Sequence, residues 1–135
     1  MAAKTTFLAN RVLDQVLNFN AQFAYSWPTT VYAAVFTADP TNTGSIVSEV
    51  VDAVAPYARQ PITWGTISAG SIANSVAVTY NVAGVSWGTI GWAGIMDVAT
   101  LLTGNMLYHG ILGSSKLVGI GDQVSFAIGA LVATE

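Results

Sequence analysis

Residues 29–38 read TTVYAAVFTA, and this stretch decides the fold class. It is rich in β-branched and aromatic residues, which pack well on a pleated strand and are typical of one. Residues 39–44 follow with DPTNTG, a run of turn formers in which Pro presets φ and Asn and Gly tolerate positive φ. The two stretches together predict a strand that ends in a tight turn.

Similar short stretches continue along the rest of the chain. The first of them, residues 57–64, contains Pro61. Because Pro has no N–H to donate to a neighbouring strand, this expected strand lies at a sheet edge or a bulge. Glycine-rich pieces at 103–105, 113–115 and 119–122 predict turns, and residues 45–56 predict a loop or a short covering segment. The expected strands cover residues 57–64, 75–82, 87–96, 105–112, 116–118 and 123–132. Short strands without intervening helices predict an all-β fold, an antiparallel β-sandwich of the jelly-roll or Ig-like kind.

One amphipathic helix is expected before the strands, over residues 6–18. Thr5 or Thr6 can cap it by accepting a backbone N–H bond. Its apolar positions recur at helical spacing on one face: Leu8, Val12, Leu13, Val16 and Leu17. The favoured interpretation is that this face covers the protein's own core. The alternative is that it clasps a neighbouring subunit.

The composition bounds the class of protein. The 135 residues fit a single domain (1–135), with an N-terminal arm and helix at 1–20 and the sandwich at 29–133. Only 8% of them are charged, against about 25% in ordinary domains. Four Lys+Arg against seven Asp+Glu give a net charge of -3, so we expect no nucleic-acid partner. A surface so poor in charge indicates either burial in a large assembly or insertion in a membrane.

The membrane explanation does not fit the pattern of apolar residues. A spanning helix needs about 20 consecutive apolar residues, and the densest apolar stretches here are much shorter. Polar and charged residues such as Asn10, Arg11 and Asp14 interrupt the N-terminal segment, so we expect no signal peptide. The expectation is therefore a chain made in the host cytoplasm, with no membrane partner, that becomes part of an assembly.

No pattern of residues predicts catalysis or a bound cofactor. The absence of Cys excludes disulfides and thiol chemistry, and a single His excludes multi-His metal sites. His109 lies within an expected strand and is interpreted as an edge-facing or hydrogen-bonded residue. The acids are scattered without a calcium loop, although Glu49 and Asp52 lie close together. We expect no enzyme activity, no catalytic, cofactor or metal site, and no cofactor.

Two groups of residues invite a binding interpretation. Arg59 lies in a chain with few charges, so it either pairs with a carboxylate or crosses an interface. Four tryptophans can form a sugar-binding platform or, as the more ordinary interpretation, pack in the core and at its rim. These are Trp27, Trp64, Trp87 and Trp92.

Nine short blocks follow one another in a characteristic order within residues 6–132. They are VYAAVFTADP (31–40), SEV (48–50), YARQ (57–60), NSVAVTY (74–80), WGTI (87–90), GIMD (94–97), NMLYHG (105–110), GDQVSF (121–126) and GAL (129–131). This series resembles a family of small structural proteins of tailed bacteriophages, whose members are often labelled tail fibre proteins. A sandwich of this size is also similar to head decoration, or cement, proteins. Pro61 and residues 53–56 depart from the family pattern at one sheet edge.

The resemblance implies a virion component, and the charge-poor, compact chain favours the head. We expect a decoration protein that binds the outer surface of the major capsid protein, stabilises the shell, and associates with itself as a dimer or trimer. The alternatives are a tail component (fibre base, tail-tip or adaptor subunit) bound to tail proteins, and a carbohydrate-binding module. Residues 1–6 with the helix are the expected capsid clasp, and 123–132 an edge strand that pairs across subunits. The candidate interface residues are Leu8, Arg11, Val12 and Arg59.

Overall fold

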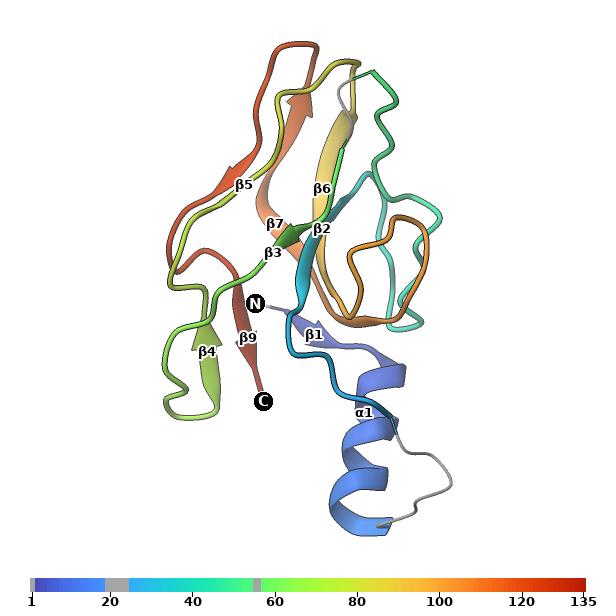
Figure 1. The fold of residues 1–135 in the computed structure, drawn as a ribbon, viewed down its shortest axis with the longest axis vertical. Helices are drawn as coiled ribbons and strands as arrows, with labels where there is room; N and C mark the ends of the chain where they lie inside the picture. The colour runs from blue at the N-terminus through green and yellow to red at the C-terminus, as the bar shows by residue number, and fades with distance from the viewer. Residues whose placement is uncertain (1, 19–24, 55–56) are drawn as a thin grey trace.

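A five-stranded antiparallel sheet forms the frame of the protein (Figure 1). The computed structural model describes residues 2–18, 25–54 and 57–135. Within them the order of elements is β1 (Ala3–Lys4), α1 (Thr6–Leu13), η1 (a π-helix, Asp14–Asn18), β2 (Tyr32–Phe36), β3 (Gln60–Pro61), β4 (Ser71–Ala73), β5 (Val78–Thr79), β6 (Gly88–Met96), β7 (Met106–Val118), β8 (Ser125–Phe126) and β9 (Val132–Thr134). The all-β, antiparallel class with one N-terminal helix is confirmed.

The large sheet has the order β1-β7-β6-β2-β3, so β2, β6 and β7 form its centre. The stretch that decided the fold class supplies β2, whose four residues 33–36 are at most 1% exposed. Such burial on both faces explains why the strand reads as a continuous apolar run. Pro61 pairs with Tyr32 at the outermost strand, which confirms its expected edge position.

Two short sheets, β4–β9 and β5–β8, cover one face of the large sheet. A parallel bridge between Ala2 and Ala133 and an antiparallel bridge between Trp64 and Asn74 join the layers at two edges. The main core fills the space between them. At its centre the rings of Tyr57 and Tyr80 stack at 5.6 Å, and the Trp87 ring meets Tyr57 edge-on at 5.5 Å.

A smaller core lies on the other face of the large sheet. Ala34, Phe36, Met96 and Met106 form it, and the segment that follows β2 covers it through Ile46. Gly94 lets these side chains approach the backbone, because a Cβ at this position would lie 2.9 Å from the Met106 Cε and 3.0 Å from the Phe36 ring and would force them to shift. Of the segment at 45–56, expected to be a loop or a short covering segment, Ile46 thus packs on this smaller core and Val50 on the main core.

The expected strands near the C-terminus need correction. Residues 105–112 and 116–118 form one strand, β7, and 113–115 are not a turn. Ile90 pairs with Lys116 and Trp92 with Ile111, so four residues of β7 bulge opposite Gly91. The small Gly and Ser side chains absorb a bulge instead of reversing the chain.

The expected strand at 123–132 is likewise wrong. The chain forms β8, bends, and then forms β9, with Gly129 at a φ of 79° in the bend. β8 pairs with β5 and β9 pairs with β4 in two separate two-stranded sheets, so the segment is divided between two sheets and does not form the single long edge strand that was expected. β4 follows a tight turn through Ala69 and Gly70, both at positive φ, and the sequence pattern did not indicate it.

The helix begins and ends where the sequence predicted, with a π-helical last turn. Thr5 is the N-cap and accepts a hydrogen bond from the Leu8 N–H at 3.3 Å. Part of the segment before it, which was expected to belong to a capsid-clasping arm, is held to the sheet, and the clasp itself stays a prediction. Ala3 and Lys4 pair with His109 and Tyr108 of β7, because their backbone groups find partners on the sheet edge.

Candidate interaction surfaces

The last turns of the helix expose apolar side chains. Leu8 is 5% exposed, whereas Leu13, Val16 and Leu17 are 54%, 60% and 73% exposed. Their spacing places these three side chains on one face, and we call them the helix-end patch. Figure 1 shows the helix extending away from the sheets toward its C-terminal end. The favoured interpretation, that the whole apolar face covers the protein's own core, is therefore wrong for this half of the helix.

Two of the candidate interface residues lie beside the helix-end patch. Arg11 is partly buried, with its Nη1 3.6 Å from the Asp14 carboxylate and its guanidinium 5.4 Å from the centre of the Phe7 ring. Val12 is also partly buried. Both remain near enough to solvent to border a contact made by the helix-end patch.

The other two candidates, Leu8 and Arg59, are buried inside the chain. The Arg59 guanidinium donates to both Glu49 carboxylate oxygens at 2.7 Å, and both side chains are fully buried. Of the two expectations for Arg59, pairing with a carboxylate is the one the structure shows. Placing Leu8 and Arg59 at an interface is corrected, since burial leaves neither a surface for a partner.

Glu49 and Asp52, three residues apart in the sequence, belong to separate hydrogen-bond networks. Asp52 is 4% exposed, and its Oδ2 accepts the Trp87 Nε1–H and the Gly84 N–H, both at 2.8 Å. Each carboxylate is thus engaged in holding loops to the core. In the part of the chain that the structure describes, no three His, Asp or Glu side chains are grouped to hold a metal ion.

His109 has a structural hydrogen bond. Its Nε2 lies 3.0 Å from the Asn42 Oδ1, and its Nδ1 lies 3.8 Å from the Asp39 carboxylate. These contacts tie β7 to the turn after β2. The interpretation of His109 as a hydrogen-bonded strand residue is confirmed.

The four tryptophans lie in four different surroundings. Trp87 is in the main core, and Trp92 packs on the smaller core. Trp64 is at the rim of the main core, whereas Trp27 is 42% exposed and meets the Tyr25 ring edge-on at 4.9 Å. Core and rim packing is therefore the outcome for Trp64, Trp87 and Trp92, and the four indole rings do not form one sugar-binding platform.

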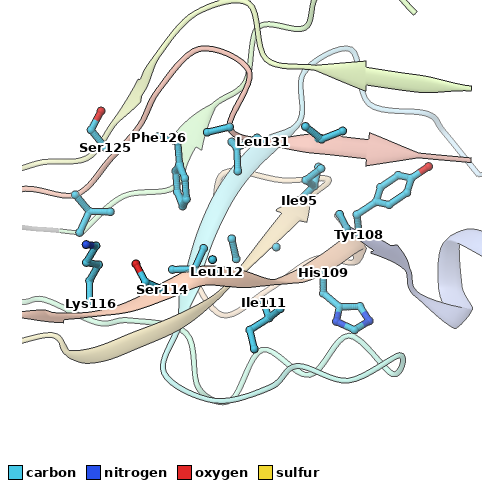
Figure 2. A pocket seen from close by; sticks show the side chains of 18 residues that line it. Ile95, Tyr108, His109, Ile111, Leu112, Ser114, Lys116, Ser125, Phe126 and Leu131 are labelled. Carbon is cyan, nitrogen blue, oxygen red and sulfur yellow. The ribbon is translucent and has the colours of Figure 1, made fainter. Parts of the chain in front are cut away.

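Two apolar grooves open on the surface. One, of about 450 Å³, lies between β6–β7 and the segment that carries β8. In Figure 2, Leu112, Ser114 and Lys116 of β7 point toward Phe126, whereas Ile111 points to the opposite side of the sheet.

The second groove, of about 410 Å³, is bordered by Trp64 and Tyr108 and ends at Glu135. Burial, followed by the nearby Glu135 charge, raises the pKa of Tyr108 to about 12. A hydrogen bond from Lys4, 2.7 Å away, lowers the pKa of Glu135. Around neutral pH the Tyr108 hydroxyl is thus protonated and the Glu135 carboxyl ionised.

Comparisons with known proteins identify the family to which this chain belongs. None of the described helices has the length and apolar character needed to cross a membrane. No curated protein matches the chain in a sequence comparison. A family model described as podophage GP4 fiber I protein gp80 matches residues 3–134, nearly the whole chain. The expectation of a phage structural family labelled as tail fibre is confirmed, and the chain belongs to the Gp80 family of podophage fiber I proteins.

Proposed function

We propose that this chain is a structural, non-enzymatic subunit of the virion fibre, attached to a neighbouring virion protein through the helix-end patch. The family description names a fiber protein, which supports this location. The observation that carries the proposal is the exposure of Leu13, Val16 and Leu17 at the end of a helix that leads away from the sheets. Their partner is a tail protein with a complementary apolar surface.

Burial of this patch supplies the attachment energy. Removing one Leu or Val side chain from water contributes about 1.5–3 kcal/mol when it is fully buried. Three such side chains on one helical face form a compact anchor of the kind that helix-in-groove contacts use. With only 8% charged residues, the chain has few ion pairs to offer, so apolar contacts are the main source of affinity.

Head decoration is the second candidate. The low charge density favours it, because a protein surrounded by many neighbours does not need a heavily charged surface to stay dispersed. In this role the partner is the major capsid protein, and binding only to the assembled shell stabilises that shell by mass action. The helix-end patch would then face the capsid.

The fibre and head-decoration roles are distinguished by measuring the copy number of this protein per virion. Quantitative mass spectrometry of purified virions gives the ratio of this protein to the major capsid protein. The fibre proposal expects a small fraction, whereas a ratio near one would overturn it and support head decoration.

The attachment surface is tested in the same virions. The triple substitution Leu13→Gln, Val16→Gln and Leu17→Gln is expected to leave the chain folded and to abolish its incorporation. A matched control replaces three other exposed apolar side chains with Gln: Val47, Ile67 and Ile120, which are 88%, 71% and 76% exposed. Equal incorporation of both variants would exclude the helix-end patch as the attachment site.

A further inference from the structure

One long strand edge of the large sheet is open. β7 pairs with β6 along much of its length, but on its other side β1 pairs only with Tyr108 and His109. Among the described residues, no strand pairs with that side of 110–118. Native proteins usually shorten, cover or charge such an edge, and here Lys116 is the only charged residue in that stretch.

The open edge lies beside a gap between the two layers. Elsewhere the layers are joined by the bridges at Ala2–Ala133 and Trp64–Asn74. Along 110–116 the edge instead borders the groove of about 450 Å³, with Ser125 and Phe126 on the opposite rim (Figure 2). The groove lies over the inner face of β6 and β7, and among the described residues no strand occupies the edge of β7 beside it.

The side chains of this edge are complementary to themselves. Ile111 and Leu117 are 66% and 75% exposed. Residues 112–115 bulge relative to β6, but Leu112, Ser114 and Lys116 still point to one side of β7 and Ile111 to the other (Figure 2), so alternation places Ile111 and Leu117 on the same, outer face. If a second β7 runs antiparallel with Ser114 opposite its own copy, Ile111 of each chain lies opposite Leu117 of the other. The residues around the axis are Gly113, Ser114 and Ser115, which are small enough to let the backbones approach.

The repulsion between the two Lys116 side chains is weak in this register. Each Lys116 lies two residues from the axis, so the two ammonium groups are separated by about 14 Å along the strands. That distance exceeds the Debye length of about 10 Å at 0.1 M salt, so their repulsion is screened. Each Lys116 lies opposite Leu112 of the other chain, and its aliphatic stem can cover that side chain.

We propose that two copies of this chain pair through their β7 edges, antiparallel and two-fold symmetric about Ser114, into one continuous sheet. A two-fold interface uses the same patch on both subunits, and the Ile111–Leu117 complementarity meets that requirement. The pairing does not depend on whether the protein lies in the fibre or on the head, because it uses none of the helix-end patch.

A single cysteine tests the register in the full-length protein, which has no cysteine of its own. Directly opposite residues of antiparallel strands have Cβ atoms about 4.5–5.5 Å apart, close to disulfide reach. Ser114→Cys is therefore expected to give a disulfide-linked dimer under mild oxidation. Ser68→Cys, at an exposed serine before β4, serves as the control and is expected to remain monomeric. Crosslinking of Ser114→Cys no faster than Ser68→Cys would overturn the proposal.

Sedimentation equilibrium tests the apolar contacts without a crosslink. The double substitution Ile111→Lys and Leu117→Lys is expected to weaken self-association by about tenfold or more, since it removes both cross-strand apolar pairs. Val47→Lys with Ile67→Lys is the matched control, at 88% and 71% exposure in the original chain, and is expected to associate as the original does. Circular dichroism verifies that both variants are folded. Unchanged self-association of the β7 variant contradicts the proposal.

Discussion

The Arg59 guanidinium and the Glu49 carboxylate face each other through two 2.7 Å hydrogen bonds in a fully buried site. Arg59 also donates to two carbonyls of residues 98–103, and Glu49 accepts one N–H from the same loop. A buried ion pair offsets its desolvation only when the remaining hydrogen-bonding groups are satisfied as well. The pair therefore fixes this loop against the segment that follows β2.

Removing one partner of this pair is expected to be costly. Glu49→Leu leaves a buried guanidinium without its carboxylate and should lower the free energy of unfolding by about 3–5 kcal/mol. The double variant Glu49→Leu/Arg59→Met removes both charges and should be more stable than the single variant. Urea unfolding measures both, and equal losses would contradict the argument. Lys4→Met, which breaks the exposed pair with Glu135, should cost only about 0–1 kcal/mol.

Asp52 is expected to matter through the donors it satisfies. Asp52→Ala leaves the Trp87 indole N–H and the Gly84 N–H without their acceptor, at about 1–3 kcal/mol for each buried donor left unpaired. Asp52→Asn keeps one acceptor oxygen and should lose less. Chemical unfolding followed by circular dichroism gives the values. Asp122→Ala is the control, since this exposed acid accepts one N–H in a surface turn, and a loss as large as that of Asp52→Ala would contradict the assignment.

The parts of the fold that follow from local chemistry could be predicted from the sequence. A capping Thr at 5 or 6 and the helical spacing after it predicted the helix, and the β-branched and aromatic run around Val35 predicted the strand that the structure shows as β2. Pro61 indicated an edge because its missing N–H is a local property. These features need no knowledge of distant residues.

The sequence predictions were wrong where contacts between residues far apart in the chain determine the structure. Residues 113–115 carry turn formers, yet pairing on both sides of them with β6 keeps β7 one continuous strand and turns the excess residues into a bulge. Burial of Arg59 depends on Glu49 ten residues away, and both burial and interface contact were compatible with the sequence. The helix-end patch has the same pattern as a buried helix face, because periodicity does not say whether a core lies beneath it.

Alkaline pH is expected to destabilise the protein through its buried tyrosines. Burial raises the pKa of Tyr57 and Tyr80 well above the usual value near 10. Above about pH 10 the unfolded chain releases phenolic protons that the folded chain retains, so stability falls as pH rises and is unaffected below that range. Urea midpoints between about pH 8 and 11 measure this slope, which a flat profile would contradict.

Tyr80→Phe separates this effect from general alkaline damage. The Tyr80 hydroxyl is buried and makes no hydrogen bond with the described residues, so its removal should cost little at neutral pH. The variant should lose less stability than the original chain between about pH 9 and 11. Tyr57→Phe differs, because the Tyr57 hydroxyl accepts the Val35 N–H at 3.0 Å and its loss should destabilise at every pH.

Thr5 joins the helix to the sheet, and its substitution is expected to affect both. Its hydroxyl oxygen accepts the Leu8 N–H and donates to the Met106 carbonyl, and the residue is completely buried. Loss of the cap alone costs about 1 kcal/mol, and leaving a buried carbonyl unpaired costs a further 1–3 kcal/mol or so. Thr5→Ala should therefore lower the melting temperature clearly, whereas Thr6→Ala, one residue along and exposed, should change it little. If the two variants melt together, Thr5 does not make the connection that its contacts indicate.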